Sequence, residues 1–176
     1  FEWLRKLKEK GLIHHFGASV ESTEEAKLCM KVDGLSSLQI IFNVLRPMPI
    51  LSVFHQCYSK GIGLIVRLPL ASGLLTGKFN RNSVFQSSDH RQYNRDGLSF
   101  NIGETFAGLP FEWGVKLCQD LKNYWPQKGT MAQNALRWVL DHPEVSVVIP
   151  GATTPEHVRK NVAAGRLEPL AQSLHE

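Results

Sequence analysis

The sequence predicts an α/β fold built on a parallel sheet. Three short runs, Leu38–Val44, Ile62–Arg67 and Glu144–Ile149, are nearly continuous in apolar residues rather than alternating with polar ones. Such runs are typical of strands buried on both faces, as in a parallel sheet. Between them lie segments whose apolar residues recur at helical spacing. The alternation of strands and helices indicates a series of βα units.

The first elements are marked by local signals. A helical pattern over residues 1–10 stops at Gly11, as helices often do. Leu12–Ser19 follows as the first expected strand. Ser22 and Glu25, three residues apart, form a capping box that begins the next helix.

Proline and glycine set most of the later boundaries. Pro47 and Pro49 break the second strand, Gly61 ends the helix after it, and Pro69 stops the third strand. Thr154 is expected to cap the last long helix, with a proline in its first turn. The expected helices cover residues 22–32, 50–60, 111–124, 130–141 and 154–164, followed by a short helix or tail at 167–176.

A long polar stretch, residues 76–110, interrupts this rhythm after the third strand. Loops of this length are usually lids or binding loops, or they are disordered. Its aromatic residues either line a pocket or pin the loop to the rest of the fold. The four considered for either role are Phe85, Tyr93, Phe100 and Phe106.

The composition is that of a folded domain. The chain has 176 residues, 43% hydrophobic and 20% charged, which is enough for one domain with a sizeable core. No apolar run approaches the ~18 residues of a membrane-spanning helix, and no signal peptide is visible. Cys29, Cys57 and Cys118 are sparse and widely spaced, which predicts reduced thiols in a cytoplasmic protein and no metal site.

The net charge of +4 is spread along the chain without a nucleic-acid recognition module. We therefore expect no nucleic-acid partner and no membrane association. Mild basicity also suits a pocket for an anionic cofactor.

Two architectures fit the order of elements: part of a (β/α)8 barrel, or a small doubly wound sheet. A doubly wound sheet usually has a glycine-rich turn after its first strand, and Phe16–Glu21 lacks one. The glycine-rich segments instead follow the third and fourth strands, at Pro69–Lys78 and Ile149–His157. A (β/α)8 barrel commonly binds phosphate after its last two strands. These segments therefore favour a phosphate-bearing ligand, held by backbone N–H groups and a helix N-terminus.

Five segments carry a resemblance to the aldo-keto reductases. They are Phe16–Val20, Leu38–Asn43, Arg67–Lys78, Ala132–Val139 and Ile149–Asn161, in the order seen in that family. The chain resembles the C-terminal half of such an enzyme, strands five to eight of its (β/α)8 barrel. The resemblance implies metal-free, NADPH-dependent reduction of a small-molecule carbonyl substrate, with NAD as the alternative cofactor.

The same resemblance implies roles at the nicotinamide end. Ser19 and Gln39 would hydrogen-bond the carboxamide from neighbouring strands, although Val20 stands where the family usually has a second polar residue. Asn43 is either a partner of Gln39 or structural. Arg67 stands where the family often has an aromatic residue, and its planar guanidinium would stack on the ring or pair with the pyrophosphate.

Further roles follow for the phosphates and the adenosine. The backbone of one segment would hold the pyrophosphate, with Lys78 adding a charge; its residues are Pro69, Leu70, Ala71, Gly73 and Leu75. The second segment would bind the adenosine side. Its residues are Gly151, Ala152 and Thr153 at the phosphate, His157 near the ribose, and Lys160 and Asn161 near the adenine.

The family's catalytic tetrad of Asp, Tyr, Lys and His comes from the first half of the barrel, and its motifs are absent here. Tyr58, Tyr93 and Tyr124 have no Lys–Asp pair beside them in the pattern, so no catalytic residue is assigned. The chain is expected to hold much of a cofactor site and to be inactive alone. Two alternatives stay open: a non-catalytic nucleotide-binding or regulatory module on this scaffold, and, ranked last, another phosphate-binding barrel enzyme.

The chain begins with Phe inside an uncapped helical pattern, which predicts that further residues precede it in the native protein. Half a barrel leaves two unpaired strand edges and an exposed apolar face, both of which favour association. We expect the isolated chain to be poorly soluble, or to dimerise, when the missing N-terminal half is absent.

Overall fold

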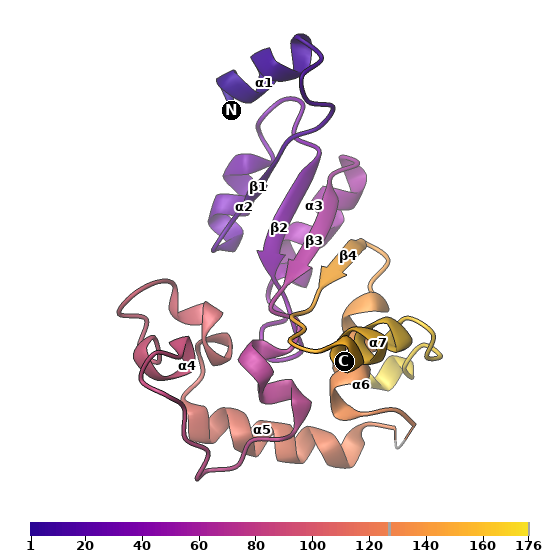
Figure 1. Cartoon of the computed structure of the whole chain (residues 1–176). Helices are drawn as coiled ribbons and strands as arrows, with labels where there is room; N and C mark the ends of the chain where they lie inside the picture. Colours follow the sequence, from indigo (N-terminus) through magenta and orange to yellow (C-terminus); the bar gives the residue numbers. More distant parts are fainter. Residues whose placement is uncertain (127, 176) are drawn as a thin grey trace.

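Figure 1 shows a computed structural model of the chain, which describes residues 1–126 and 128–175. Its centre is a parallel sheet in the order β1-β2-β3-β4, so each strand pairs with its neighbour in sequence. The strands are β1 (Gly17–Ser19), β2 (Ser37–Ile41), β3 (Gly63–Arg67) and β4 (Val145–Ile149). The prediction of an α/β fold with a parallel sheet is confirmed.

The predicted helices occur in the predicted order; α5 has the predicted bounds and the others are shorter, and α4 is an additional helix within the long loop. The α-helices are α1 (Glu2–Glu9), α2 (Thr23–Cys29), α3 (His55–Ser59), α4 (His90–Tyr93), α5 (Phe111–Tyr124), α6 (Met131–Leu140) and α7 (Pro155–Ala164). A π-helical turn, η1 (Ile50–Phe54), leads into α3. The short 3₁₀ turns are η2 (Ala71–Thr76), η3 (Ile102–Glu104), η4 (Phe106–Gly108) and η5 (Gln172–Leu174). Within the predicted tail 167–176 only this last turn is regular, and Glu176 lies outside the described residues.

The capping prediction at Ser22 is confirmed in part, and the one at Thr154 is confirmed in full. The Ser22 hydroxyl accepts a hydrogen bond from Glu25 N at 3.1 Å, while the Glu25 carboxylate accepts from Glu21 N, one residue earlier than an ideal capping box. The Thr154 hydroxyl accepts from His157 N at 3.2 Å and begins α7.

The first strand is shorter than predicted. The run Leu12–Ser19 contributes only Gly17–Ser19 to the sheet, because pairing with β2 begins where Gly17 meets Ser37. Residues 12–16 precede that register and have no strand beside them in the described structure.

The two faces of the sheet differ in burial. On one face Leu38, Leu64 and Val66 are completely buried in a core that includes residues of α2, α3 and α6. On the other, Val147 and Ile149 are 43% and 45% exposed. The prediction of burial on both faces is therefore wrong for this chain taken alone, because its described residues leave much of the second face uncovered.

In Figure 1 the strands point toward the region of α4, α5 and α7, and α1 lies beyond their amino ends. A second hydrophobic cluster forms at the carboxyl end, from η2, α5 and the long loop. None of the helices among residues 1–126 and 128–175 combines the length and apolar character needed to cross a membrane.

Candidate functional site

A cleft of about 720 Å³ opens at the carboxyl ends of β3 and β4. Its walls are the turn after β3, part of the long loop, the start of α6, and the segment from β4 into α7. Ligands of parallel α/β proteins bind at this end of the strands. The two glycine-rich segments singled out in the sequence thus converge on one cavity.

Most of the residues singled out for cofactor binding line this cleft. They are Arg67, Pro69, Leu70, Gly73, Lys78, Gly151, Ala152, Thr153, His157, Lys160 and Asn161. Ala71 and Leu75 do not, because their side chains are buried in the cluster beneath the turn, so only their backbone could face a ligand.

Ser19 and Gln39 also lie outside the cleft lining, but they are direct partners across β1 and β2. Ser19 is exposed and Gln39 half-buried. In the next pair of strands, Gln39 pairs with Ile65, two residues before Arg67. Ser19 and Gln39 therefore lie side by side, on the edge strand β1 and its neighbour β2.

The turn after β3 is conformationally strained. Leu68, Ala71 and Ser72 have φ values of 52°, 47° and 54°, and Gly73 has 96°. Left-handed backbone is costly for residues other than glycine and persists only where surrounding contacts enforce it. One such contact is Asn43 Nδ2, which donates to Leu68 O at 2.9 Å.

Asn43 has a structural role. It is completely buried, and besides its bond to Leu68 O its Oδ1 accepts from Leu45 N at 3.0 Å. These bonds tie the end of β2 to the turn after β3. Of the two readings left open by the sequence, the geometry supports the structural one.

Arg67 lies between two carboxylates. Its Nη2 is 2.9 Å from Glu21 Oε1, and its Nη1 is 2.9 Å from Glu104 Oε1. The Arg67 side chain is only 12% exposed, whereas the side chains of Glu21 and Glu104 are 39% and 30% exposed. Arg67 is therefore held as a link between β1 and the long loop, with its charge compensated, and it is not a free cation.

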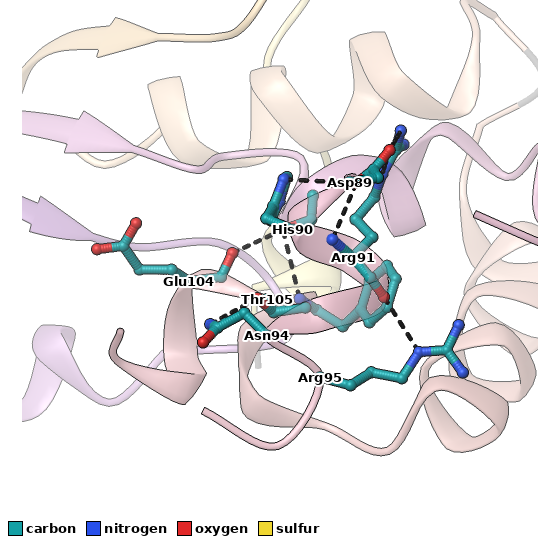
Figure 2. A network of polar contacts seen from close by, with 9 residues as sticks. Asp89, His90, Arg91, Asn94, Arg95, Glu104 and Thr105 are labelled. Atoms are coloured by element: carbon teal, nitrogen blue, oxygen red, sulfur yellow. Dashed lines mark hydrogen bonds and ion pairs between the residues drawn. The ribbon is translucent and has the colours of Figure 1, made fainter. Parts of the chain in front are cut away.

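The long loop is ordered by a polar network (Figure 2). Asp89 caps α4 by accepting from Arg91 N, and it pairs with the Arg91 guanidinium at 2.6 to 3.1 Å. Hydrogen bonds from the Arg91 side chain lower the pKa of Asp89 to about 2. Buried Asn94 donates to Thr105 Oγ1 at 3.1 Å. His90, Arg91 and Glu104 bring this loop into the lining of the cleft.

The loop's aromatic residues have different roles. Phe106 is 1% exposed and packs with Phe85 against Phe111 of α5, which pins the loop to the fold. Tyr93 and Phe100 are 45% and 36% exposed. None of the loop aromatics singled out in the sequence belongs to the cleft lining, so the pinning interpretation holds for Phe85 and Phe106.

The opposite wall is built by local contacts. Asn161 Nδ2 donates to Gly151 O at 3.2 Å, and Thr153 Oγ1 lies 3.2 Å from His157 Nδ1. A Cβ on Gly151 would meet nothing within 4 Å, so this backbone borders open space. The amino end of α7 carries a partial positive charge that favours an anion.

Several site residues were not predicted from the sequence. Glu21, Glu104, His90 and Arg91 come from the first strand's end and the long loop, where no local pattern marks them. Asp89 before a short helical run was the one available signal, since Asp is a preferred N-cap.

Comparison with known proteins places these features in a family. The family model described as "Aldo/keto reductase family" matches residues 1–175. The NADH-specific methylglyoxal reductase of Escherichia coli is 26% identical over 92% of this chain and 46% of its own length. A probable voltage-gated potassium channel subunit beta of Arabidopsis thaliana is 36% identical over 64% of this chain and 32% of its own length.

Solved structures agree on the fold. A glycerol dehydrogenase from Gluconobacter oxydans matches 97% of this chain and 49% of its own, with a TM-score of 0.74 and 24% identity. An aldo-keto reductase from Bacillus halodurans matches 97% of this chain and 51% of its own, with a TM-score of 0.72 and 22% identity. The chain spans about a third to a half of the length of these relatives. The structures show the fold, and the family model that spans residues 1–175 shows that the chain belongs to the aldo/keto reductase family.

Proposed function

We propose that this chain forms the cofactor-binding half, strands five to eight, of an NADPH-dependent aldo-keto reductase acting on a small carbonyl compound. NAD is the alternative cofactor. The observation that carries the proposal is the convergence of the turns after β3 and β4 on one cleft. The chain spans about half the length of several relatives, which agrees with half of a barrel.

The cleft suits a dinucleotide. The strained turn at Ala71–Gly73 resembles the backbone concavities that hold phosphates. Gly151 borders open space, and the amino end of α7 stands beside it. The charged lining residues are Arg67, Lys78, Arg91, Lys160 and Glu104. Arg67, Arg91 and Lys160 are each paired with a carboxylate, so the support for an anionic ligand comes mainly from the backbone of the two turns and the amino end of α7.

In the proposed complex, Ser19 and Gln39 orient the carboxamide, the β3 turn holds the pyrophosphate, and Gly151–Thr153 with His157, Lys160 and Asn161 hold the adenosine side. The nicotinamide cofactor, when bound, supplies the hydride for carbonyl reduction. The reaction also needs a proton donor. Tyr58, Tyr93 and Tyr124 lie outside the cleft lining, so we propose that the proton comes from another part of the protein and that this chain alone is inactive.

The half-exposed face of the sheet also supports the proposal that this chain is one half of a barrel. Val147 and Ile149 would be covered by the remainder of a barrel, and β1 and β4 are the edges it would pair with. A second copy of the chain could substitute for it in the isolated polypeptide. Light scattering is expected to show association, and a stable, compact monomer would contradict this part of the proposal.

The test is cofactor binding measured apart from turnover. The 176-residue chain is titrated with NADPH and NADH by fluorescence, and carbonyl reduction is assayed in parallel. We expect binding without turnover, with tighter binding of NADPH. Turnover by this chain alone would contradict the claim of inactivity, and absence of binding in a folded sample would contradict the cofactor proposal.

A matched pair of variants locates the binding. Ala152→Glu places a negative charge in the cleft lining, and Val162→Glu places the same charge on an exposed position of α7 outside it. Repulsion of the cofactor phosphates should weaken NADPH binding about tenfold or more for Ala152→Glu alone. Equal effects of the two variants would indicate that NADPH binds elsewhere.

A second candidate is a regulatory, non-catalytic module that binds the same cofactor. The similarity to a protein named as a probable potassium channel subunit beta favours it. Assays of cofactor binding and carbonyl reduction on the protein isolated from its native source distinguish the two. Carbonyl turnover supports the reductase, and cofactor binding without turnover supports the regulatory module.

A further inference from the structure

Helix α5 is anchored to the molecule by one face. Phe111, Gly114, Val115 and Cys118 are buried on that face, in the hydrophobic cluster shared with η2 and the long loop. A Cβ on Gly114 would lie 2.6 Å from Leu74 Cδ1, so the helix and η2 are in close contact there. These contacts fix the rotation of α5 about its own axis and determine which of its residues face outward.

The outer face of α5 carries an exposed apolar stripe. Trp113, Leu117 and Tyr124 are 69%, 39% and 75% exposed. Their spacing of one and then two helical turns places them in line along the helix. In Figure 1, α5 forms the lower margin of the molecule, apart from the edge strand β1. Contiguous apolar side chains on a protein surface often mark a site of association.

Charges of alternating sign accompany the stripe. Glu112, Lys116 and Asp120 are exposed and follow one another about one helical turn apart. Within the described residues, none of the three takes part in an ion pair. Helices that bind anionic membranes are rich in Lys and Arg, and this face is not. It suits instead a surface that presents the same charges in the reverse order.

A second copy of α5 running antiparallel presents such a surface. A two-fold axis midway between Trp113 and Tyr124 places each Trp113 opposite Tyr124 of the second copy. The same axis brings Lys116 to within about 1.5 Å, one residue's rise along the helix, of the height of Asp120 in the second copy. A parallel pair of helices would place Lys116 against Lys116 and Asp120 against Asp120. The charges therefore favour the antiparallel arrangement.

We propose that the outer face of α5 is an interface through which two copies of this chain associate, with their α5 helices antiparallel. At their exposed fractions, the two copies of Trp113 and Tyr124 would together bury on the order of 400–700 Å². Complexes that bury less than about 1,200 Å² are usually weak and transient. The dimer is therefore expected to form reversibly and to depend on protein concentration.

This interface is distinct from the open face of the sheet, where the remainder of a barrel is proposed to pack. That face includes Val147 of β4, which is 43% exposed and lies outside the hydrophobic cluster that holds α5. Val147→Lys therefore opposes association through the sheet and leaves the stripe on α5 intact.

The first experiment measures the dimer dissociation constant of the 176-residue chain by sedimentation equilibrium. Tyr124→Lys should weaken dimerisation by about tenfold or more, as expected for the loss of a central aromatic contact. Tyr58→Lys is the matched control, because Tyr58 is a tyrosine of α3 that is 67% exposed, and it should stay within about twofold of the parent. Thermal unfolding shows whether both variants are folded. A monomeric parent, or equal constants for the parent and Tyr124→Lys, would overturn the proposal.

A charge exchange tests the antiparallel register. Lys116→Asp and Asp120→Lys each bring like charges together across the two-fold axis and should each weaken dimerisation by about threefold or more. The double variant restores opposite charges at both places and should return to within about twofold of the parent. A general loss of stability would not produce this recovery. A double variant that dimerises no better than the single ones would show that the register is wrong.

Two further results would assign the association or the stripe elsewhere. If Val147→Lys abolishes association and Tyr124→Lys does not change it, the copies meet through the sheet and the inference is wrong. Flotation with vesicles of phosphatidylcholine and phosphatidylserine tests a membrane. A parent that stays monomeric and floats with the vesicles, while Tyr124→Lys does not float, would overturn the dimer in favour of a lipid surface.

Discussion

The two walls of the cleft are built in different ways. The wall after β3 depends on distant contacts: Ala71 and Leu75 are buried, Asn43 holds Leu68 from the neighbouring strand, and Phe106 packs beneath the turn from the long loop. The wall after β4 is exposed over residues 151–156 and is shaped by a helix cap and short-range hydrogen bonds. One wall is maintained by contacts from several parts of the fold, and the other mainly by its own residues and by α6, whose Gln133 Nε2 donates to Lys160 O at 3.1 Å.

The largest expected difference between the walls is in packing. Phe106→Ala removes a ring that is 1% exposed and lies 4.9 Å from the Phe111 ring, and it should lower the free energy of unfolding by about 3–5 kcal/mol. Val162→Ala, on the exposed surface of α7, should change it by less than about 0.5 kcal/mol. Urea unfolding measures both. Similar losses for the two variants would remove the distinction between the walls.

A smaller difference should appear at the glycines. Gly77 ends η2 with φ 67°, and a Cβ there would lie 2.6 Å from Met131 Sδ, so Gly77→Ala should cost about 1–3 kcal/mol. Gly151→Ala meets no atom within 4 Å and should cost less than about 1 kcal/mol. The shift in thermal midpoint compares them, and a greater loss for Gly151→Ala would contradict the assignment of strain to the β3 wall.

The cap of α7 tests how local the second wall is. Thr154→Ala removes the hydroxyl that accepts from His157 N and should cost about 1 kcal/mol. Hydrogen exchange should speed up in the first turn of α7 and leave the β3 turn unchanged. Val162→Ala, at an exposed position later in α7, is the control, and faster exchange across both walls would show that they are coupled.

The smallest expected effect is on the stability of the protein at low pH. The pKa of Asp89 is lowered to about 2 in the folded protein by Arg91, below its ordinary value near 3.9. The ionised carboxylate thus stabilises the loop above about pH 4, and this contribution is lost as the pH falls toward 2. Urea midpoints between pH 5 and pH 2 should fall less steeply for Asp89→Asn than for the parent. Identical slopes would exclude a role of Asp89 in acid stability.

The contrast between the walls also explains what the sequence could predict. Thr154, Pro155 and Gly151 form a local pattern, and the structure has the predicted cap and turn at those residues. Arg67 was correctly placed at the end of a strand, but its partners Glu21 and Glu104 lie far from it in sequence. No periodicity encodes such pairs. The strand at Leu12–Ser19 was overextended for a similar reason, since its length depends on where β2 begins.

The order of the strands has a consequence for how the chain folds. Because each strand pairs with the one before it, β1, β2 and β3 can assemble one βα unit at a time as the chain is synthesised. The β3–β4 pair must wait until residues 68–144, including the long loop, have been made. Both walls of the cleft therefore meet only in the last step, so an unfinished chain would already contain three of the four strands while lacking the cleft.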